Sequence, residues 1–139
     1  MKNNAVLEEA VTWLKTPYHH KAMVKLVGVD CAHFLIGVYS KVYSLPPIAV
    51  EDYPADWHLH QGGERFLAYI KEHCSRVYDP QPGDIAMFKF GRCVSHGSIV
   101  VEWPRIIHSY YGQGVVYASA NDAALHGRVH SFWRVEEVG

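Results

Sequence analysis

Hydrophobic residues recur at helical spacing in the N-terminal part of the chain. One apolar stripe predicts a helix over residues 5–15, and its members are Val6, Ala10, Trp13 and Leu14. Asp30 is a suitable N-cap for a second helix that starts at Cys31, because its carboxylate can accept the free backbone N–H groups of the first turn. A further apolar stripe predicts a third helix over residues 63–73.

The periodicity changes to that of β-strands after a Pro-Gln-Pro-Gly turn signal at residues 80–83. The β-branched and aromatic runs that follow predict strands over residues 84–90, 96–102, 105–111, 115–120 and 129–135. Short turn-forming segments such as Trp103-Pro104 suit the hairpins between them. Helices followed by an antiparallel sheet of about five strands favour the α+β class over alternating α/β.

The composition suits one domain over residues 1–139. Hydrophobic residues make up 49% and charged residues 19%, so the chain can bury a core. The net charge of -1 provides no basic surface for nucleic acid. No apolar run approaches the roughly 20 residues of a membrane helix, and the N-terminus lacks the apolar core of a secretory signal. We therefore expect a chain made in the cytoplasm, with neither nucleic acid nor a membrane as a partner.

Ten histidines accompany only three cysteines, Cys31, Cys74 and Cys93. The cysteines form no CxxC pair, which argues against a disulfide scaffold and against a structural zinc ribbon. Cys31 lies at the predicted first turn of a helix, where backbone N–H groups and the helix dipole stabilise a reactive thiolate. The alternative is a thiol buried as a small hydrophobe. Cys74, at the end of the third helix, and Cys93, in a hairpin turn region, are assigned that ordinary role.

His96 and His108 lie on consecutive predicted strands and are separated by 12 residues. Antiparallel pairing about the Trp103-Pro104 turn lets both point to the same face of the sheet. One ring can then take a thiol proton while the other orients it, although half-buried surface histidines remain the simpler alternative. A metal site is a further alternative, through His19, His20, His58, His60 and His108, but no recognisable ligand set completes it.

Short segments of the chain resemble, in order, those of the NlpC/P60 cysteine peptidases, which are papain-like. The matching segments are residues 13–18, 30–31, 81–85, 95–100 and 107–108. The resemblance implies that Cys31 is the nucleophile, His96 the general base and acid, and His108 the orienting residue, with no cofactor. It also implies that the Tyr18 hydroxyl lies near the oxyanion site, and that Asp30 helps to hold the amine of the substrate.

The resemblance implies hydrolysis of amide bonds in the stem peptides of peptidoglycan. Ala32-His33 replaces the Ser-Gly that follows the nucleophile in many cell-wall relatives, which bears on the usual γ-D-glutamyl-diamino-acid specificity. The Pro46-Pro47, Tyr53-Pro54 and 112–116 segments look like the branch of the family encoded among phage tail genes. That branch implies action on the cell wall after delivery by a phage tail, with tail proteins as partners. The alternatives are a secreted toxin, a papain-like amidase or acyltransferase on another substrate, and a non-catalytic tail module.

Overall fold

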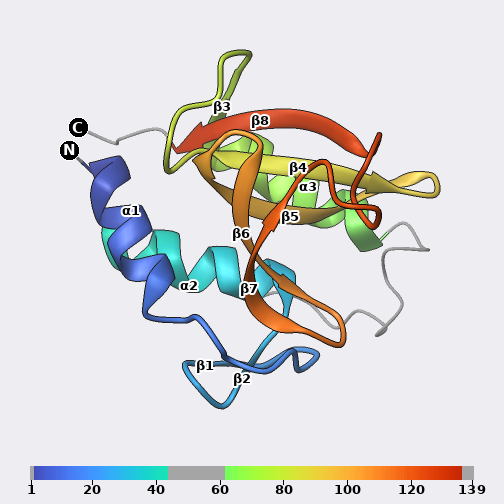
Figure 1. Cartoon of the computed structure of the whole chain (residues 1–139). Coiled ribbons are helices and arrows are strands. Elements are labelled where there is room, and N and C mark those ends of the chain that lie inside the picture. Colours follow the sequence, from blue (N-terminus) through green and yellow to red (C-terminus); the bar gives the residue numbers. More distant parts are fainter. Residues whose placement is uncertain (1, 44–61, 136–139) are drawn as a thin grey trace.

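The structure is a computed structural model that describes residues 2–43 and 62–135 (Figure 1). Its helices are α1 (Lys2–Val11), α2 (Cys31–Tyr43) and α3 (Gly62–His73). Its strands are β1 (Met23–Val24), β2 (Gly28–Val29), β3 (Cys74–Val77), β4 (Ile85–Phe90), β5 (Cys93–Glu102), β6 (Arg105–Tyr110), β7 (Gly114–Ser119) and β8 (Val129–Val135). The predicted α+β class is confirmed, since helices precede an antiparallel sheet.

The main sheet has six strands in the order β3-β8-β4-β5-β6-β7, and neighbouring strands are antiparallel. It is therefore one strand larger than the expected sheet of about five. The additional strand is β3, which begins at Cys74 directly after α3, so the placement of Cys74 at the end of a helix is wrong. β8 lies between β3 and β4 and closes the sheet with the last described residues of the chain.

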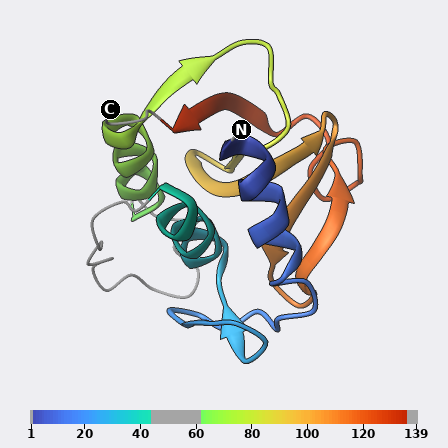
Figure 2. The ribbon, with the colours of Figure 1, turned by 90° about the vertical axis from the view of Figure 1, so that its left-hand side faces the viewer.

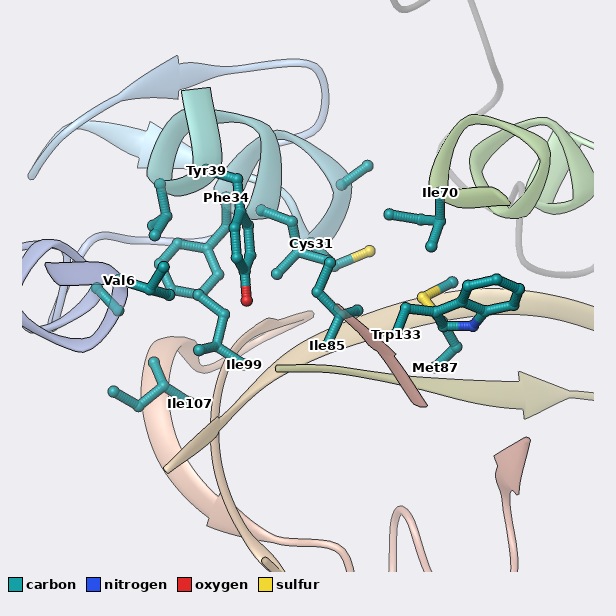
Figure 3. Packing of buried hydrophobic residues seen from close by; sticks show 14 of the residues in the cluster. Val6, Cys31, Phe34, Tyr39, Ile70, Ile85, Met87, Ile99, Ile107 and Trp133 are labelled. Atoms are coloured by element: carbon teal, nitrogen blue, oxygen red, sulfur yellow. The ribbon is translucent and has the colours of Figure 1, made fainter. Parts of the chain in front are cut away.

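The main hydrophobic core lies between the helices and one face of the sheet. Figures 1 and 2 show α1 and α2 side by side against the strands. Alternate residues of β4, Ile85 and Met87, face this core and are at most 1% exposed. Figure 3 shows Phe34 of α2 projecting toward Ile99 of the sheet. Because fully burying such a side chain contributes about 1.5–3 kcal/mol, this layer fixes α2 on the sheet.

The start of α2 is as predicted, and the end of α1 is not. Asp30 caps α2, since the His33 backbone N–H donates to its Oδ1 at 2.8 Å. α1 ends at Val11 although the apolar stripe continues to Trp13, which is 5% exposed. The chain leaves the helix there because Lys15 takes a positive φ of 75° and donates its backbone N–H to the Val115 carbonyl. The apolar pattern of the sequence therefore extends beyond the last residue of the helix.

A buried carboxylate connects the turn before β4 to the last strand. Asp84 is fully buried and accepts two hydrogen bonds, from Nε and Nη2 of Arg134, each 2.8 Å long. Its Oδ2 also accepts the Gln81 backbone N–H at 2.8 Å. The Tyr39 hydroxyl of α2 donates to the Gly83 carbonyl in the same turn at 2.6 Å. The turn thus joins β8, β4 and α2, the three elements around which the sheet and helices assemble.

No helix within residues 2–43 or 62–135 is long and apolar enough to cross a membrane. The Pro46-Pro47 and Tyr53-Pro54 segments of the proposed tail-associated branch lie outside the described residues.

Candidate active site

A pocket of about 240 Å³ lies at the N-terminal end of α2. Its lining residues are Tyr18, Cys31, Phe90, Ser95, His96, Ser109, Tyr110 and Tyr111. The structure therefore brings together three of the five predicted site residues, Tyr18, Cys31 and His96, in one cavity wall. His108 lies directly behind His96, and Asp30 lies behind Cys31 without lining the pocket.

Cys31 is the first residue of α2 and is 4% exposed. Burial raises the pKa of its thiol well above the usual range, and the negative charge of Asp30 raises it further. Backbone N–H groups of Gly97, Ala32 and Cys31 itself act in the opposite direction. These N–H groups stabilise a thiolate in the way expected of a helix N-terminus, but burial outweighs them. The free thiol therefore keeps its proton near pH 7 and points its S–H toward the Ser95 carbonyl, 3.9 Å away.

His96 and His108 are joined by a short contact between their rings. His96 Nε2 lies 2.8 Å from His108 Nδ1, and the strands that carry them pair antiparallel with Ile99 opposite Ile107. The prediction that both side chains share a face of the sheet is confirmed. The placement of His96 at a strand start is wrong, because β5 begins three residues earlier, at Cys93. Cys93 accordingly lies in a strand and not in the turn region.

His108 is only 3% exposed, and burial lowers its pKa to about 4 against the opposing charge of Asp122. Its ring is therefore neutral near pH 7, so that one nitrogen accepts a hydrogen bond and the other donates. If His108 Nδ1 accepts the His96 Nε2 proton, Nδ1 of His96 is the nitrogen that carries no proton and can act as the base. The second histidine can thus fix which nitrogen of the first one reacts.

A β-bulge lies immediately before His96. Phe88 of β4 pairs with His96 and Lys89 pairs with Val94, so Ser95 is the extra residue with no partner opposite it. The bulge places the Ser95 carbonyl against the Cys31 thiol. Bulges are common next to active sites because they redirect side chains that a regular strand would point elsewhere.

Aromatic rings surround His96 and restrict its orientation. The ring centroids of Phe88, Phe90 and Tyr110 lie 5.9, 5.8 and 5.6 Å from that of His96. Tyr110 also stacks on His108 at 5.1 Å. Such contacts hold an imidazole in one plane, as a base that must face a particular thiol requires.

Tyr18 and Asp30 occupy different environments. Tyr18 lines the pocket with Tyr111 5.5 Å away, and burial raises the pKa of its hydroxyl, so it remains a hydrogen-bond donor. Asp30 is 1% exposed, and its carboxylate accepts the Lys21 backbone N–H and both the backbone and the ring nitrogen of His33, each at 2.8 Å. Its oxygens are thus engaged within the protein, and its contact with a substrate amine stays a prediction.

The remaining wall residues were not identified from the sequence. Tyr110 lies two residues after His108, so the strand period places it on the same face and offered a usable signal. The place of Ser95 in the pocket wall depends on the bulge, and the places of Phe90 and Ser109 depend on how the strands pair. No local sequence pattern reveals either.

The metal alternative finds no support in residues 2–43 and 62–135, where no three His, Cys, Asp or Glu side chains are placed to hold an ion. Two of its proposed ligands, His58 and His60, lie outside the described residues.

No protein-family model and no curated protein matches the chain. Solved structures do match. An NlpC/P60 family protein from Bacillus cereus ATCC 10987 has a TM-score of 0.71 at 17% identity, and the match covers 96% of this chain and 40% of that one. The chain has the NlpC/P60 fold. A protein similar to a lipoprotein, of the NLP/P60 family, from Staphylococcus aureus subsp. aureus Mu50 has a TM-score of 0.69 at 19% identity, over 96% of this chain and 41% of that one.

The chain thus spans about two fifths of these two longer proteins. The NlpC/P60 domain of the peptidoglycan hydrolase SagA is closer in length, with a TM-score of 0.63 at 20% identity over 96% of this chain and 97% of that domain. The resemblance drawn from short sequence segments is confirmed at the level of the NlpC/P60 fold.

Proposed function

We propose that this chain is a cysteine hydrolase that cleaves an amide bond in the peptides of peptidoglycan. One observation carries the proposal: Cys31 and His96 line the same pocket, and His96 is backed by His108 at 2.8 Å. A nucleophile, a base and a group that orients the base form the arrangement of covalent hydrolases. The peptidoglycan hydrolase among the proteins of the same fold supports the substrate class.

The reaction begins from a neutral thiol, because burial raises the pKa of Cys31. As sulfur attacks the amide carbonyl carbon, Nδ1 of His96 takes the thiol proton. The carbonyl oxygen becomes negative and is stabilised by the Cys31 backbone N–H and the Tyr18 hydroxyl, an interaction worth about 3–4 kcal/mol per donor in studied enzymes.

Collapse of this adduct breaks the C–N bond, and His96 gives its proton to the leaving amine. Water then attacks the thioester, with His96 again taking a proton, and releases a carboxylic acid and the Cys31 thiol. His108 keeps the imidazole in the required tautomer throughout. The overall change is one amide and one water converted to one amine and one acid.

The test is digestion of purified peptidoglycan, followed by mass spectrometry of the released fragments. The unaltered protein should release peptides that together gain the mass of one water, and Cys31→Ala should release none. Cys74→Ala, which removes another buried thiol in β3, is the matched control and should keep the activity. Undiminished release by Cys31→Ala contradicts the proposal, whereas loss of ammonia alone indicates an amidase and acyl transfer to an amine an acyltransferase.

Delivery by a phage tail is the finer part of the proposal and has a separate test. Neighbouring tail genes would support it, and a neighbouring immunity gene would support a secreted toxin instead.

A further inference from the structure

Among the residues that the structure describes, the pocket wall contains no Lys, Arg, Asp or Glu side chain. Half of its described residues are aromatic: Tyr18, Phe90, Tyr110 and Tyr111. Such a wall can cover a substrate residue and exclude water, but its described residues include no Lys or Arg to pair with a carboxylate. Moving an ion from water into this wall without a partner is costly.

Asp30 places a negative charge beside the pocket. After burial, this charge contributes to the raised pKa of Cys31 and, behind the charge of Cys31, to that of Tyr18, so it acts on two of the wall residues. The Asp30 oxygens are already bonded to Lys21 and His33. Asp30 therefore disfavours an anion in the pocket, while a cation finds no free carboxylate oxygen among the described residues of the wall.

Ser95 contributes the wall group that lacks a partner. Its Oγ is buried and makes no hydrogen bond to any described residue. Ser109, the other serine of the wall, donates to the Val29 carbonyl at 2.8 Å. A buried hydroxyl without a partner costs free energy that a ligand able to bond with it can recover. Because Ser95 lines the pocket, rotation about its Cα–Cβ bond is the movement by which the hydroxyl would meet such a ligand.

We propose that this pocket selects a substrate residue that carries a neutral amide next to the cleaved bond, and that Ser95 hydrogen-bonds to that amide. The inference rests on the proposed function and adds the charge class of the substrate. A carboxamide and a carboxylate have nearly the same size and shape, so the pocket distinguishes them by charge. The amide can both donate to and accept from the serine hydroxyl.

The experiment compares three stem peptides that differ only in one group beside the cleaved bond: a carboxamide, a carboxylate or an amine. We expect kcat/KM for the carboxamide peptide to exceed that for the other two at least about tenfold, the size expected when a polar pocket group is left unpaired or a charge is poorly solvated. Equal rates, or a faster reaction of either charged peptide, overturn the inference.

The affinities of the same peptides for the Cys31→Ala protein measure the preference of the pocket without turnover. A preserved preference for the carboxamide supports the inference even where no peptide is cleaved, and in that case only the proposed hydrolysis fails. Equal affinities overturn the inference even if peptidoglycan is digested. The two proposals therefore fail by different results.

Ser95→Ala tests the hydroxyl, with Ser98→Ala on the same strand as the matched control. Ser98 is fully buried too, but its Oγ donates to the Ala86 carbonyl at 3.3 Å and it does not line the pocket. We expect Ser95→Ala to raise KM for the carboxamide peptide about five- to tenfold without lowering Tm. Ser98→Ala should lower Tm and leave the peptide preference intact. If Ser95→Ala lowers Tm and leaves KM unchanged, the hydroxyl is structural and the assignment is overturned.

Discussion

The neutral, buried His108 should make the folded protein lose stability in mild acid. Its pKa is about 4 in the folded state against 6.5 for an ordinary histidine. Between these values the unfolded chain binds a proton that the folded protein does not, so stability rises with pH. The contribution is fully present above pH 6.5 and is lost as the pH falls toward 4.

The size of the effect follows from the difference between the two pKa values. Each pKa unit corresponds to about 1.4 kcal/mol, so the His108 contribution to the free energy of unfolding falls by about 2–3 kcal/mol between pH 7.5 and 4.5. Carboxylates and other histidines titrate over the same interval, so the wild-type curve alone does not isolate His108.

His108→Gln isolates it, because glutamine does not titrate and its amide can still bond to His96. Urea unfolding at pH 7.5 and at pH 4.5, followed by tryptophan fluorescence, gives the loss of stability for each protein. We expect the variant to lose about 2–3 kcal/mol less than the wild type over this interval. His126→Gln, which changes an exposed histidine, should behave as the wild type. If wild type and His108→Gln lose the same stability, His108 is not held neutral by burial and the reasoning is wrong.

Two further predictions concern the framework around the site. Asp84→Asn weakens the charge-assisted bonds to Arg134 and should lower the free energy of unfolding by about 3 kcal/mol. The control Asp79→Asn, on the same turn, should change the free energy of unfolding by less than about 0.5 kcal/mol. Equal urea midpoints for the two variants would contradict this. Gly114 has φ +79° and a Cβ there would meet the Thr16 carbonyl oxygen, so Gly114→Ala should cost about 2 kcal/mol or more. Gly112 has φ +82° and open space around it, so Gly112→Ala should lower the free energy of unfolding by only about 1 kcal/mol. An equal loss of stability in both variants would show that the close approach of Gly114 to Thr16 is unimportant.

Local sequence patterns predicted most helices and strands, because the buried residues of each element recur at one spacing. A run of β-branched and aromatic residues identified β8 with its observed bounds, and the cap at Asp30 located the start of α2. β3 was missed because Cys74–Val77 is only four residues long and follows a helix without a turn signal. β1 and β2 have two residues each, too few for any period to be visible.

The sequence predicted those features of the site that follow from strand parity and from helix capping. The 12-residue separation of His96 and His108 was enough to place them on one face. The bulge at Ser95 was not predictable, since it depends on how β5 pairs with β4. The neutral thiol of Cys31 was not predictable either, because the burial that raises its pKa comes from the assembled helices and sheet.

The position of β8 between β3 and β4 has a consequence for protein synthesis. β3 and β4 emerge from the ribosome early, but the strand that joins them in the sheet follows more than fifty residues after β3. Until β8 emerges, β4 lacks its neighbour on one side, and Asp84 lacks Arg134. An unpaired strand edge of this kind invites pairing with other chains. We expect nascent chains that end before β8 to need a chaperone or to aggregate, and the sheet to close only once Arg134 has been added.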